Sequence, residues 1–227
     1  MIDERFARLS FLIGEDKLKK LSNKHIVVLG LGGVGGYVVE SLVRSGIENI
    51  TIIDYDTVDI TNINRQIIAL TSTIGMKKTE VFKKRILDIN PNCKVKIVDS
   101  FINIDNYQDL FKENIDHSIE CCDSIKTKKL IIKYALLNDI NIISSMGAGN
   151  RMDPSKLEII EIKKTSGDPL ARIIRKFLKD EKINKKLMVM CSSEIPKKSY
   201  EFIASNAFVP PSAGLLISSY VIKTLIK

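Results

Sequence analysis

Short apolar runs alternate with amphipathic segments along the first two thirds of the chain. Buried runs of this length, bounded by turn residues, are typical of strands in a parallel sheet. They predict strands over 25–30, 50–54, 95–101, 118–123 and 140–149. The segments between them predict helices over 15–24, 34–45, 76–89, 106–113 and 125–138. The alternation indicates an α/β fold, a doubly wound and mainly parallel sheet with helices on both faces.

The pattern becomes less regular after Gly149. A basic helix is predicted over 168–182, a strand over 187–193 and a last helix over 212–226. No repeat, low-complexity tract or linker interrupts the chain, so we expect one domain over 1–227. Its core for nucleotide binding would be 1–149, and 150–227 would form a C-terminal extension.

A glycine-rich turn follows the first predicted strand. The chain reads GLGGVGG from Gly30, and Gly30, Gly32 and Gly35 fit the spacing GxGxxG, with Gly33 inside the turn. Glycine lets backbone N–H groups approach phosphate oxygens, and a helix that begins there adds the positive end of its dipole. Asp54 ends the next strand, where an acid commonly binds ribose hydroxyls. This context predicts a Rossmann-like nucleotide site, the alternative being a packing turn in an α/β protein without nucleotide.

The segments after Asp54 favour ATP over NAD or FAD. Asn62, Arg65 and Lys78 follow it in the sequence. Cations that converge on phosphates suit a reaction in which charge builds up on the α-phosphorus, whereas an NAD site does not need them. Asp123 ends the fourth strand, and a single carboxylate there suits Mg²⁺, which takes one or two protein carboxylates and keeps several waters.

Simpler interpretations of these residues stay open. Arg65 could be a surface arginine at a helix start, and Asp123 could cap the helix that follows it. Only one of Lys77 and Lys78 is expected in the site, and the spacing from Arg65 favours Lys78.

Charged residues are unevenly distributed along the chain. Residues 121–227 hold 19 Lys and Arg against 10 Asp and Glu, whereas residues 1–120 hold 16 against 17. This asymmetry suggests a polyanionic partner for the second half, and a merely lysine-rich, solvated surface is the equally open alternative. The predicted basic helix and the residues after it would present one face to phosphates: Arg172, Arg175, Lys176, Lys179, Lys182 and Lys186.

The four cysteines form no CxxC pair, so a zinc site is not expected, and we expect Cys121, Cys122 and Cys191 to be structural. No apolar run reaches the roughly 18 residues of a membrane helix, and no signal-peptide core is present. We therefore expect no integral membrane segment and a cytoplasmic location.

Several short motifs are spread along nearly the whole chain: Arg5-Phe6-x-Arg8, Leu12-Ile13-Gly14-Glu15, Thr61-Asn62-Ile63-Asn64-Arg65-Gln66, Gly75-x-x-Lys78, Ile89-Asn90-Pro91, Gly147-Ala148-Gly149 and Ser192-Ser193-Glu194. Together they resemble the motifs of the ThiF/MoeB/HesA superfamily, to which the ubiquitin-activating enzymes belong. Asp168-Pro169-Leu170 and Ala213-Gly214 are also present, and the zinc-binding CxxC pairs of MoeB and ThiF are missing. Within the superfamily the chain is therefore most similar to the tRNA threonylcarbamoyladenosine dehydratases.

The resemblance implies roles for individual residues. Asp54 would bind the ribose, with Asp56 beside it in the nucleotide site. Arg65, Lys78 and Asp123 would be catalytic: Arg65 with Asn62 on the triphosphate, Lys78 bridging the phosphates, and Asp123 holding Mg²⁺. Arg8 would reach the triphosphate of the other subunit in a homodimer. One departure is Glu120, which stands where the family usually has the first aspartate of an Asp-x-x-Asp motif. We expect this replacement to have little effect on metal binding, because the last acid of the motif, Asp123, is the metal candidate.

The activity implied is ATP-dependent dehydration of threonylcarbamoyladenosine in tRNA to its cyclic form, through an acyl-adenylate. The resemblance also implies sulfur-relay proteins as partners to be considered. The alternative is a MoeB- or ThiF-like adenylyltransferase that activates the C-terminal carboxylate of a ubiquitin-like carrier. An inactive dimerisation partner and an NAD-dependent oxidoreductase are weaker alternatives, since the cations and Asp123 are intact and no acid or base for hydride transfer is evident.

Overall fold

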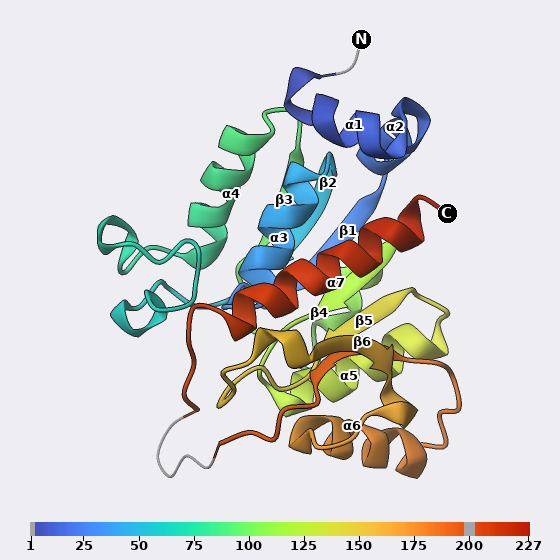
Figure 1. Cartoon of the computed structure of the whole chain (residues 1–227). Coiled ribbons are helices and arrows are strands. Elements are labelled where there is room, and N and C mark those ends of the chain that lie inside the picture. The colour runs from blue at the N-terminus through green and yellow to red at the C-terminus, as the bar shows by residue number, and fades with distance from the viewer. Residues whose placement is uncertain (1–2, 198–202) are drawn as a thin grey trace.

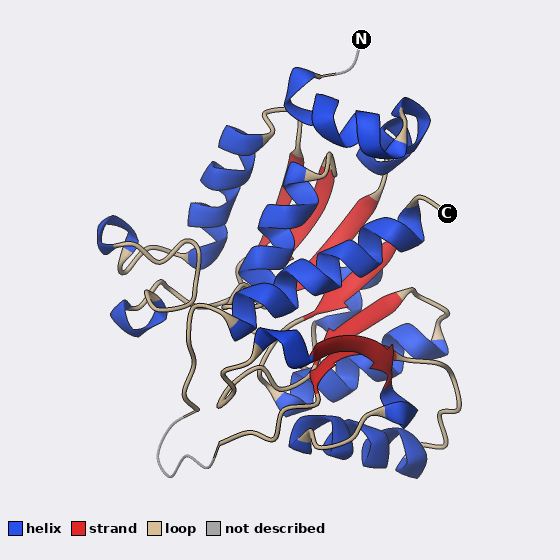
Figure 2. Cartoon of the chain, in the orientation of Figure 1, coloured by secondary structure: helices blue, strands red, loops and turns tan. Residues whose placement is uncertain are grey.

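One seven-stranded sheet runs through the molecule in the order β3-β2-β1-β4-β5-β7-β6 (Figures 1 and 2). The computed structural model describes residues 3–197 and 203–227. Six strands are parallel and β6 is antiparallel to β7. The strands are β1 (His25–Leu29), β2 (Asn49–Ile53), β3 (Lys94–Val98), β4 (His117–Glu120), β5 (Ile142–Ser145), β6 (Leu157–Glu161) and β7 (Met188–Ser192).

Helices cover both faces of the sheet. On one face lie α3 (Gly35–Arg44), α4 (Lys78–Ile89) and α7 (Val209–Leu225), while α5 (Ile125–Leu137) and α6 (Pro169–Asp180) cover the other. The short helices α1 (Ala7–Ile13) and α2 (Glu15–Ser22) lie beyond the end at which β1 begins (Figure 1). The predicted Rossmann-like α/β fold is therefore confirmed.

Alternation along the central strands builds two hydrophobic cores. In β1, Ile26 and Val28 pack under α3, α4 and α7, whereas Val27 and Leu29 pack under α5 and α6. All four side chains are buried, as expected for a parallel strand covered on both sides.

Several predicted boundaries are wrong. The segment 106–113 is not an α-helix but a short 3₁₀ helix, η4 (Tyr107–Phe111), and the strands predicted over 95–101 and 140–149 stop at Val98 and Ser145. The last helix begins at Val209, before Ser212, because its two prolines occupy the first turn, where no intrahelical N–H bond is lost.

One strand was missed. β6 lies in the region where the sequence pattern is irregular, and its burial alternates only weakly, since it is an edge strand paired on one side. Within the described residues, none of the helices combines the length and the apolar character needed to cross a membrane.

The carboxyl ends of the parallel strands meet at one edge of the sheet, and the strand order reverses between β1 and β4. In doubly wound sheets ligands bind in the crevice at such a reversal. The N-termini of α3 and α5 both lie at this edge, since each helix follows one of these strands.

Candidate active site

The glycine-rich turn joins β1 to α3 in a conformation that only glycine allows. Gly30 has φ +88°, and a Cβ placed there would lie 2.7 Å from the backbone N of Cys122. A Cβ on Gly35 would lie 1.8 Å from the carbonyl oxygen of Gly30. Among the described residues, the N–H groups of Gly32, Gly33 and Val34 have no protein acceptor. The turn therefore offers backbone donors at the start of α3, as an anion site requires.

Asp54, directly after β2, is hydrogen-bonded to the glycine-rich turn. Its Oδ2 accepts a hydrogen bond from the backbone N–H of Leu31 at 2.6 Å, and its Oδ1 accepts one from the N–H of Asp56 at 2.9 Å. The side chain is only 8% exposed. The two bonds orient the carboxylate beside the glycine turn, where lone pairs remain for ribose hydroxyls.

Lys78 is placed at the carboxyl edge of the sheet by a backbone hydrogen bond between the segments that contain Val58 and Met76. Val58 donates a backbone hydrogen bond to Met76 at 2.8 Å, and Lys78 begins α4 immediately afterwards. Its Nζ lies 2.9 Å from Oδ2 of Asp56. The side chain is 5% exposed, whereas Lys77 is exposed and its Nζ lies 3.4 Å from Asp99. The choice of Lys78 over Lys77 thus agrees with the geometry.

Asn62 and Arg65 lie on the loop that faces the glycine turn. Asn62 is 8% exposed and its Oδ1 accepts from the N–H of Asp59 at 3.2 Å. The Arg65 side chain crosses Gly33, since a Cβ on Gly33 would meet Cγ of Arg65 at 3.2 Å. Its Nη1 donates to the carbonyl of Thr61 at 2.8 Å. Arg65 therefore lies over the turn, unlike an ordinary surface arginine.

Asp123 is a further carboxylate at this edge, in addition to Asp54 and Asp56, and it lies three residues after the end of β4. It is exposed and, in the part of the chain that the structure describes, its carboxylate makes no hydrogen bond or ion pair. The negative charge of Asp56, together with burial and the charges of Asp123 and Asp54, raises the pKa of Tyr55. All three carboxylates therefore lie close enough to Tyr55 to disfavour its ionisation. The interpretation of Asp123 as a helix cap is wrong, because Ser124 caps α5 by accepting from Thr127.

Glu120 has a larger role than its sequence position suggested. It is fully buried, accepts from the N–H of Cys122 at 2.9 Å and from the hydroxyl of Ser144 at 2.5 Å, and pairs with Lys128. Lys128 also donates to the carbonyl of Ser145 at 2.9 Å. Although burial opposes the charged form, the Glu120 carboxylate raises the pKa of Lys128. This buried pair supports the loop that carries Asp123, and sequence reasoning missed Lys128 because it follows Glu120 by a full strand-to-helix turn.

The rim of the site carries an aromatic pair that sequence reasoning also missed. The rings of Tyr55 and Phe101 meet edge to face with centroids 5.1 Å apart, and both are about half exposed. They come from the ends of two neighbouring strands, so their contact depends on the strand order.

The four thiols are not activated, and Arg8 lies away from the glycine turn. Burial raises the pKa of the Cys93 and Cys191 thiols to about 12, and it also raises those of Cys121 and Cys122. Thiols held in the protonated form are poor nucleophiles, as expected for structural cysteines. Arg8 is exposed on α1, away from the glycine turn, so a single chain does not bring it to the site.

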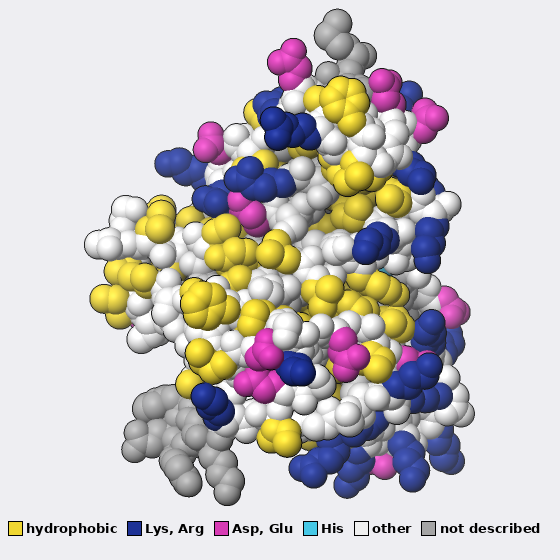
Figure 3. Space-filling model, viewed as in Figure 1, with side chains coloured by type: hydrophobic (Ala, Val, Ile, Leu, Met, Phe, Trp, Pro, Cys, Tyr) yellow, Lys and Arg dark blue, Asp and Glu magenta, His cyan; other side chains and the backbone are white. Residues whose placement is uncertain are grey.

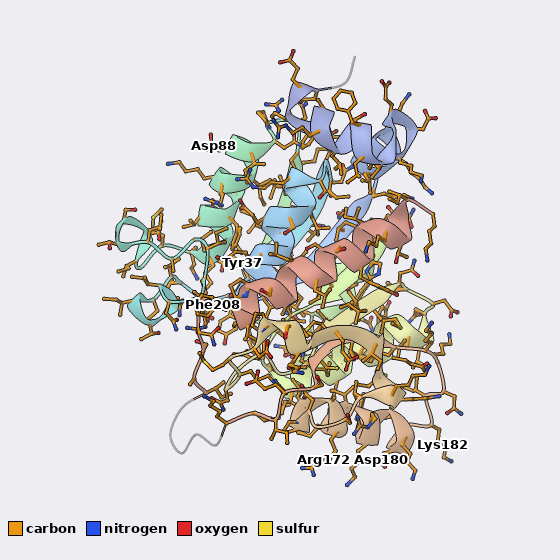
Figure 4. The ribbon with its side chains drawn as sticks, viewed as in Figure 1. Tyr37, Asp88, Arg172, Asp180, Lys182 and Phe208 are labelled. Carbon is orange, nitrogen blue, oxygen red and sulfur yellow. The ribbon has the colours of Figure 1, made fainter. Side chains whose placement is uncertain are left out.

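The predicted basic face is only partly formed. α6 ends at Asp180, and Lys182 has φ +57°, so Lys182 and Lys186 are not in register with the helix. Arg175 is half-buried and donates to the carbonyl of Thr165 at 2.7 Å. The exposed cations of α6 are Arg172, Lys176 and Lys179. Figure 4 shows Arg172 and Lys182 near opposite ends of α6, and Figure 3 shows Lys and Arg gathered over this part of the surface.

The residues present fit a nucleotide triphosphate with Mg²⁺. The turn is a cradle that a Cβ would fill, Asp54 is oriented beside it, and Lys78 and Arg65 supply positive charge. Oε1 of Gln66 is buried next to this turn without a partner among the described residues. Asp123 offers an accessible oxygen donor of the kind that Mg²⁺ prefers.

Comparisons with known proteins agree with this geometry. The model of the ThiF family matches residues 5–227. The chain is 39% identical over 241 residues to the tRNA threonylcarbamoyladenosine dehydratase of Bacillus subtilis, covering 98% of this chain and 95% of the relative. It is 43% identical over 179 residues to the dehydratase of Haemophilus influenzae, covering 79% and 69%.

Solved structures show the same likeness. The Escherichia coli tRNA N6-threonylcarbamoyladenosine dehydratase, TcdA, in complex with AMP superposes with a TM-score of 0.94 at 34% identity, covering 98% of this chain and 94% of that one. Its complex with ATP also gives a TM-score of 0.94 at 34% identity, covering 100% and 97%. The chain therefore belongs to the ThiF family, and within it to the group of the tRNA threonylcarbamoyladenosine dehydratases.

Proposed function

We propose that the protein is an ATP-dependent tRNA threonylcarbamoyladenosine dehydratase. The observation that carries the proposal is the likeness over nearly the full length to dehydratases, one of which has been solved with ATP and with AMP. The carboxyl edge of the sheet supports it, because a phosphate-binding turn, a ribose-binding acid and two cations meet there.

The reaction removes water from the substrate by converting a carboxylate into a mixed anhydride with AMP. The threonine carboxylate attacks the α-phosphorus of ATP, pyrophosphate leaves, and an acyl-adenylate forms. An atom of the neighbouring carbamoyl group then attacks the activated carbonyl, and AMP leaves as the ring closes. Because ring closure is intramolecular, its effective concentration is high, and the protein needs no covalent nucleophile. The raised pKa values of the four buried thiols agree with such a mechanism.

The residues of the site divide this work between binding and charge stabilisation. Asp54 receives the ribose, and the N–H groups of the glycine turn receive phosphate oxygens. Lys78 and Arg65 neutralise charge that develops as the α-phosphorus is attacked, an effect of order 10²–10³-fold in rate at comparable sites. Asp56 holds Lys78 until the nucleotide provides a competing anion. Asn62 orders the loop that carries Arg65.

Asp123 would hold Mg²⁺, which would neutralise phosphate charge when bound. Its position beyond β4, at the carboxyl edge that also carries Asp54 and Asp56, supports this role, as does its exposure. The buried Glu120–Lys128 pair keeps the loop in place through the N–H of Cys122.

The proposal includes a homodimer in which Arg8 of one subunit reaches the triphosphate of the other. Large exposed apolar side chains support an interface: Phe11 is 88% exposed, Leu12 81% and Phe208 59%. Figure 3 shows further apolar side chains between α3 and α7. Residues 150–227 would contribute to the interface and to the substrate-facing side. The enzyme would work in the cytoplasm, together with its tRNA.

The decisive experiment is nucleoside analysis of tRNA that carries threonylcarbamoyladenosine, after incubation with the protein and MgATP. We expect the cyclic nucleoside by mass spectrometry, together with AMP and pyrophosphate, and none of these products when ATP is replaced by NAD. The absence of cyclic product, with pyrophosphate exchange that depends on a carrier protein, would instead assign the chain to the MoeB-like adenylyltransferases.

A further inference from the structure

Two helices, α5 and α6, lie side by side on one face of the sheet and carry cations that are not used by the nucleotide site. On α5 these are Lys126, which is exposed, and Lys129, which is half-buried; they are three residues apart and therefore on one side of the helix. On α6 they are Arg172, Lys176 and Lys179, spaced by four and three residues. We refer to these five side chains as the α5–α6 basic surface.

The two rows of cations form one continuous surface. Nζ of Lys129 on α5 lies 5.4 Å from the ring centroid of Phe177 on α6, so the helices meet between the rows. Lys133 of α5 and Glu181, directly after α6, form an ion pair at 2.6 Å. In the described chain, none of the five cations takes part in an ion pair or a side-chain hydrogen bond. Asp180 is the acidic residue of α6 that remains exposed near them.

The α5–α6 basic surface begins at the carboxyl edge of the sheet, where the candidate active site lies. α5 starts two residues after Asp123. The N-terminus of α6 lies at the same edge, because Asp168, its cap, accepts a hydrogen bond from the N–H of Gly147 just beyond β5. From there α6 runs for 12 residues, about 18 Å, toward the opposite edge. Figure 4 shows this course from Arg172 to Lys182.

The composition of the surface favours RNA over a membrane or a protein as its partner. The apolar face of α6 is turned inward, with Ile174 fully buried and Leu178 5% exposed, so the helix lacks the apolar side that inserts into a membrane. Lysine is depleted at protein–protein interfaces, whereas Lys and Arg without partners are the usual contacts of RNA phosphates. Resting on the proposed function, we infer that the α5–α6 basic surface binds the phosphate backbone of the tRNA and guides its modified nucleotide to Asp123 and the glycine turn.

The test uses two variants that remove the same charge. One replaces Lys126, Lys129, Arg172 and Lys176 with Gln. The control replaces Lys17, Lys20, Lys83 and Lys84, exposed lysines of α2 and α4, with Gln. Binding of tRNA is measured at several salt concentrations, with thermal stabilisation by MgATP as a check of the nucleotide site.

For the first variant we expect tRNA affinity at low salt to fall roughly tenfold or more and the slope of log affinity against log salt to decrease by about 3, with MgATP stabilisation retained. The control should bind nearly as the wild type does. An unchanged slope, or an equal loss in the control, would overturn the inference. So would a variant that keeps tRNA binding but loses binding to phosphatidylcholine–phosphatidylserine vesicles, because the surface would then serve a membrane.

The nucleoside assay separates this inference from the proposed function. If the wild-type protein binds tRNA through this surface but forms no cyclic nucleoside, the proposed dehydratase activity is contradicted, whereas the tRNA-binding role of the surface is not. A variant that keeps wild-type kcat/KM for cyclisation and the wild-type salt slope would contradict the surface alone. A wild type that does not bind tRNA would overturn both.

Discussion

At the residue scale, Lys78 differs from its neighbour Lys77 in burial and in partner. Lys78 is 5% exposed and paired with Asp56, whereas Lys77 is exposed. We expect Lys78→Ala to lower the rate of cyclic product formation by about 10²–10³-fold, because a cation aimed at developing charge is lost. Lys77→Ala is the matched control and should stay within about twofold of the wild type. Equal rates for the two variants would remove Lys78 from the mechanism.

The buried pair of Glu120 and Lys128 makes a second prediction at this scale. Replacing either partner alone leaves an uncompensated buried charge, so Glu120→Gln and Lys128→Met should each lower the free energy of unfolding by about 3–5 kcal/mol. The double variant should lose much less than the sum, as urea denaturation can measure. Additive losses would mean that the two side chains are stabilised independently of each other.

His117, at the start of β4, predicts how stability depends on pH. Burial lowers its pKa from 6.5 to about 4. Well above pH 6.5 the imidazole is neutral in the folded and unfolded states and contributes no pH dependence. As the pH falls from 6.5 to 4, the unfolded chain binds the proton first, so up to about 3 kcal/mol of stability is lost. The difference between wild type and His117→Gln in urea denaturation should shrink over this range, and a constant difference would contradict the shifted pKa.

At the scale of elements, Asp168 joins α6 to the end of β5. Its Oδ1 caps the helix by accepting from Ala171 at 2.9 Å, and its Oδ2 lies 3.0 Å from the guanidinium of Arg151, which is equally buried. Asp168→Ala should lower the free energy of unfolding by about 3–5 kcal/mol, because Arg151 then stays buried without its counter-charge. Ser124→Ala removes only the cap of α5 and should lower it by about 1 kcal/mol. Equal losses would show that the ion pair adds nothing to the cap.

At the scale of the whole molecule, the second half of the chain completes the core of the first. Ala213, Ile217 and Val221 of α7 are fully buried in the same hydrophobic core as α3 and β1, and β7 extends the sheet beside β5. We expect residues 1–149 alone to lack a cooperative unfolding transition, whereas the full chain should unfold in one step by both far-UV circular dichroism and fluorescence of its tyrosines. Cooperative unfolding of 1–149 would divide the chain into two domains.

The sequence by itself determined those features that depend on local pattern. Short apolar runs bounded by turn residues are typical of buried strands, so the central strands were predicted. The glycine turn was predicted because the steric requirement at Gly30 and Gly35 leaves little choice of residue. Family motifs predicted roles for Asp54, Arg65, Lys78 and Asp123; the structure places all four at the carboxyl edge of the sheet, and their roles stay predictions.

The tertiary structure alone decided which residues meet across the fold. Local pattern does not report that Lys128 neutralises Glu120, that Asp168 is the counter-charge of Arg151, or that β6 pairs antiparallel at the edge, because each contact joins separate elements. The helical spacing of basic residues continued to Lys186 in the sequence, yet α6 ends at Asp180 and Arg175 is bound to Thr165. Charge periodicity is local, whereas exposure and pairing depend on the neighbouring elements, so only the fold placed Lys126 and Lys129 beside α6.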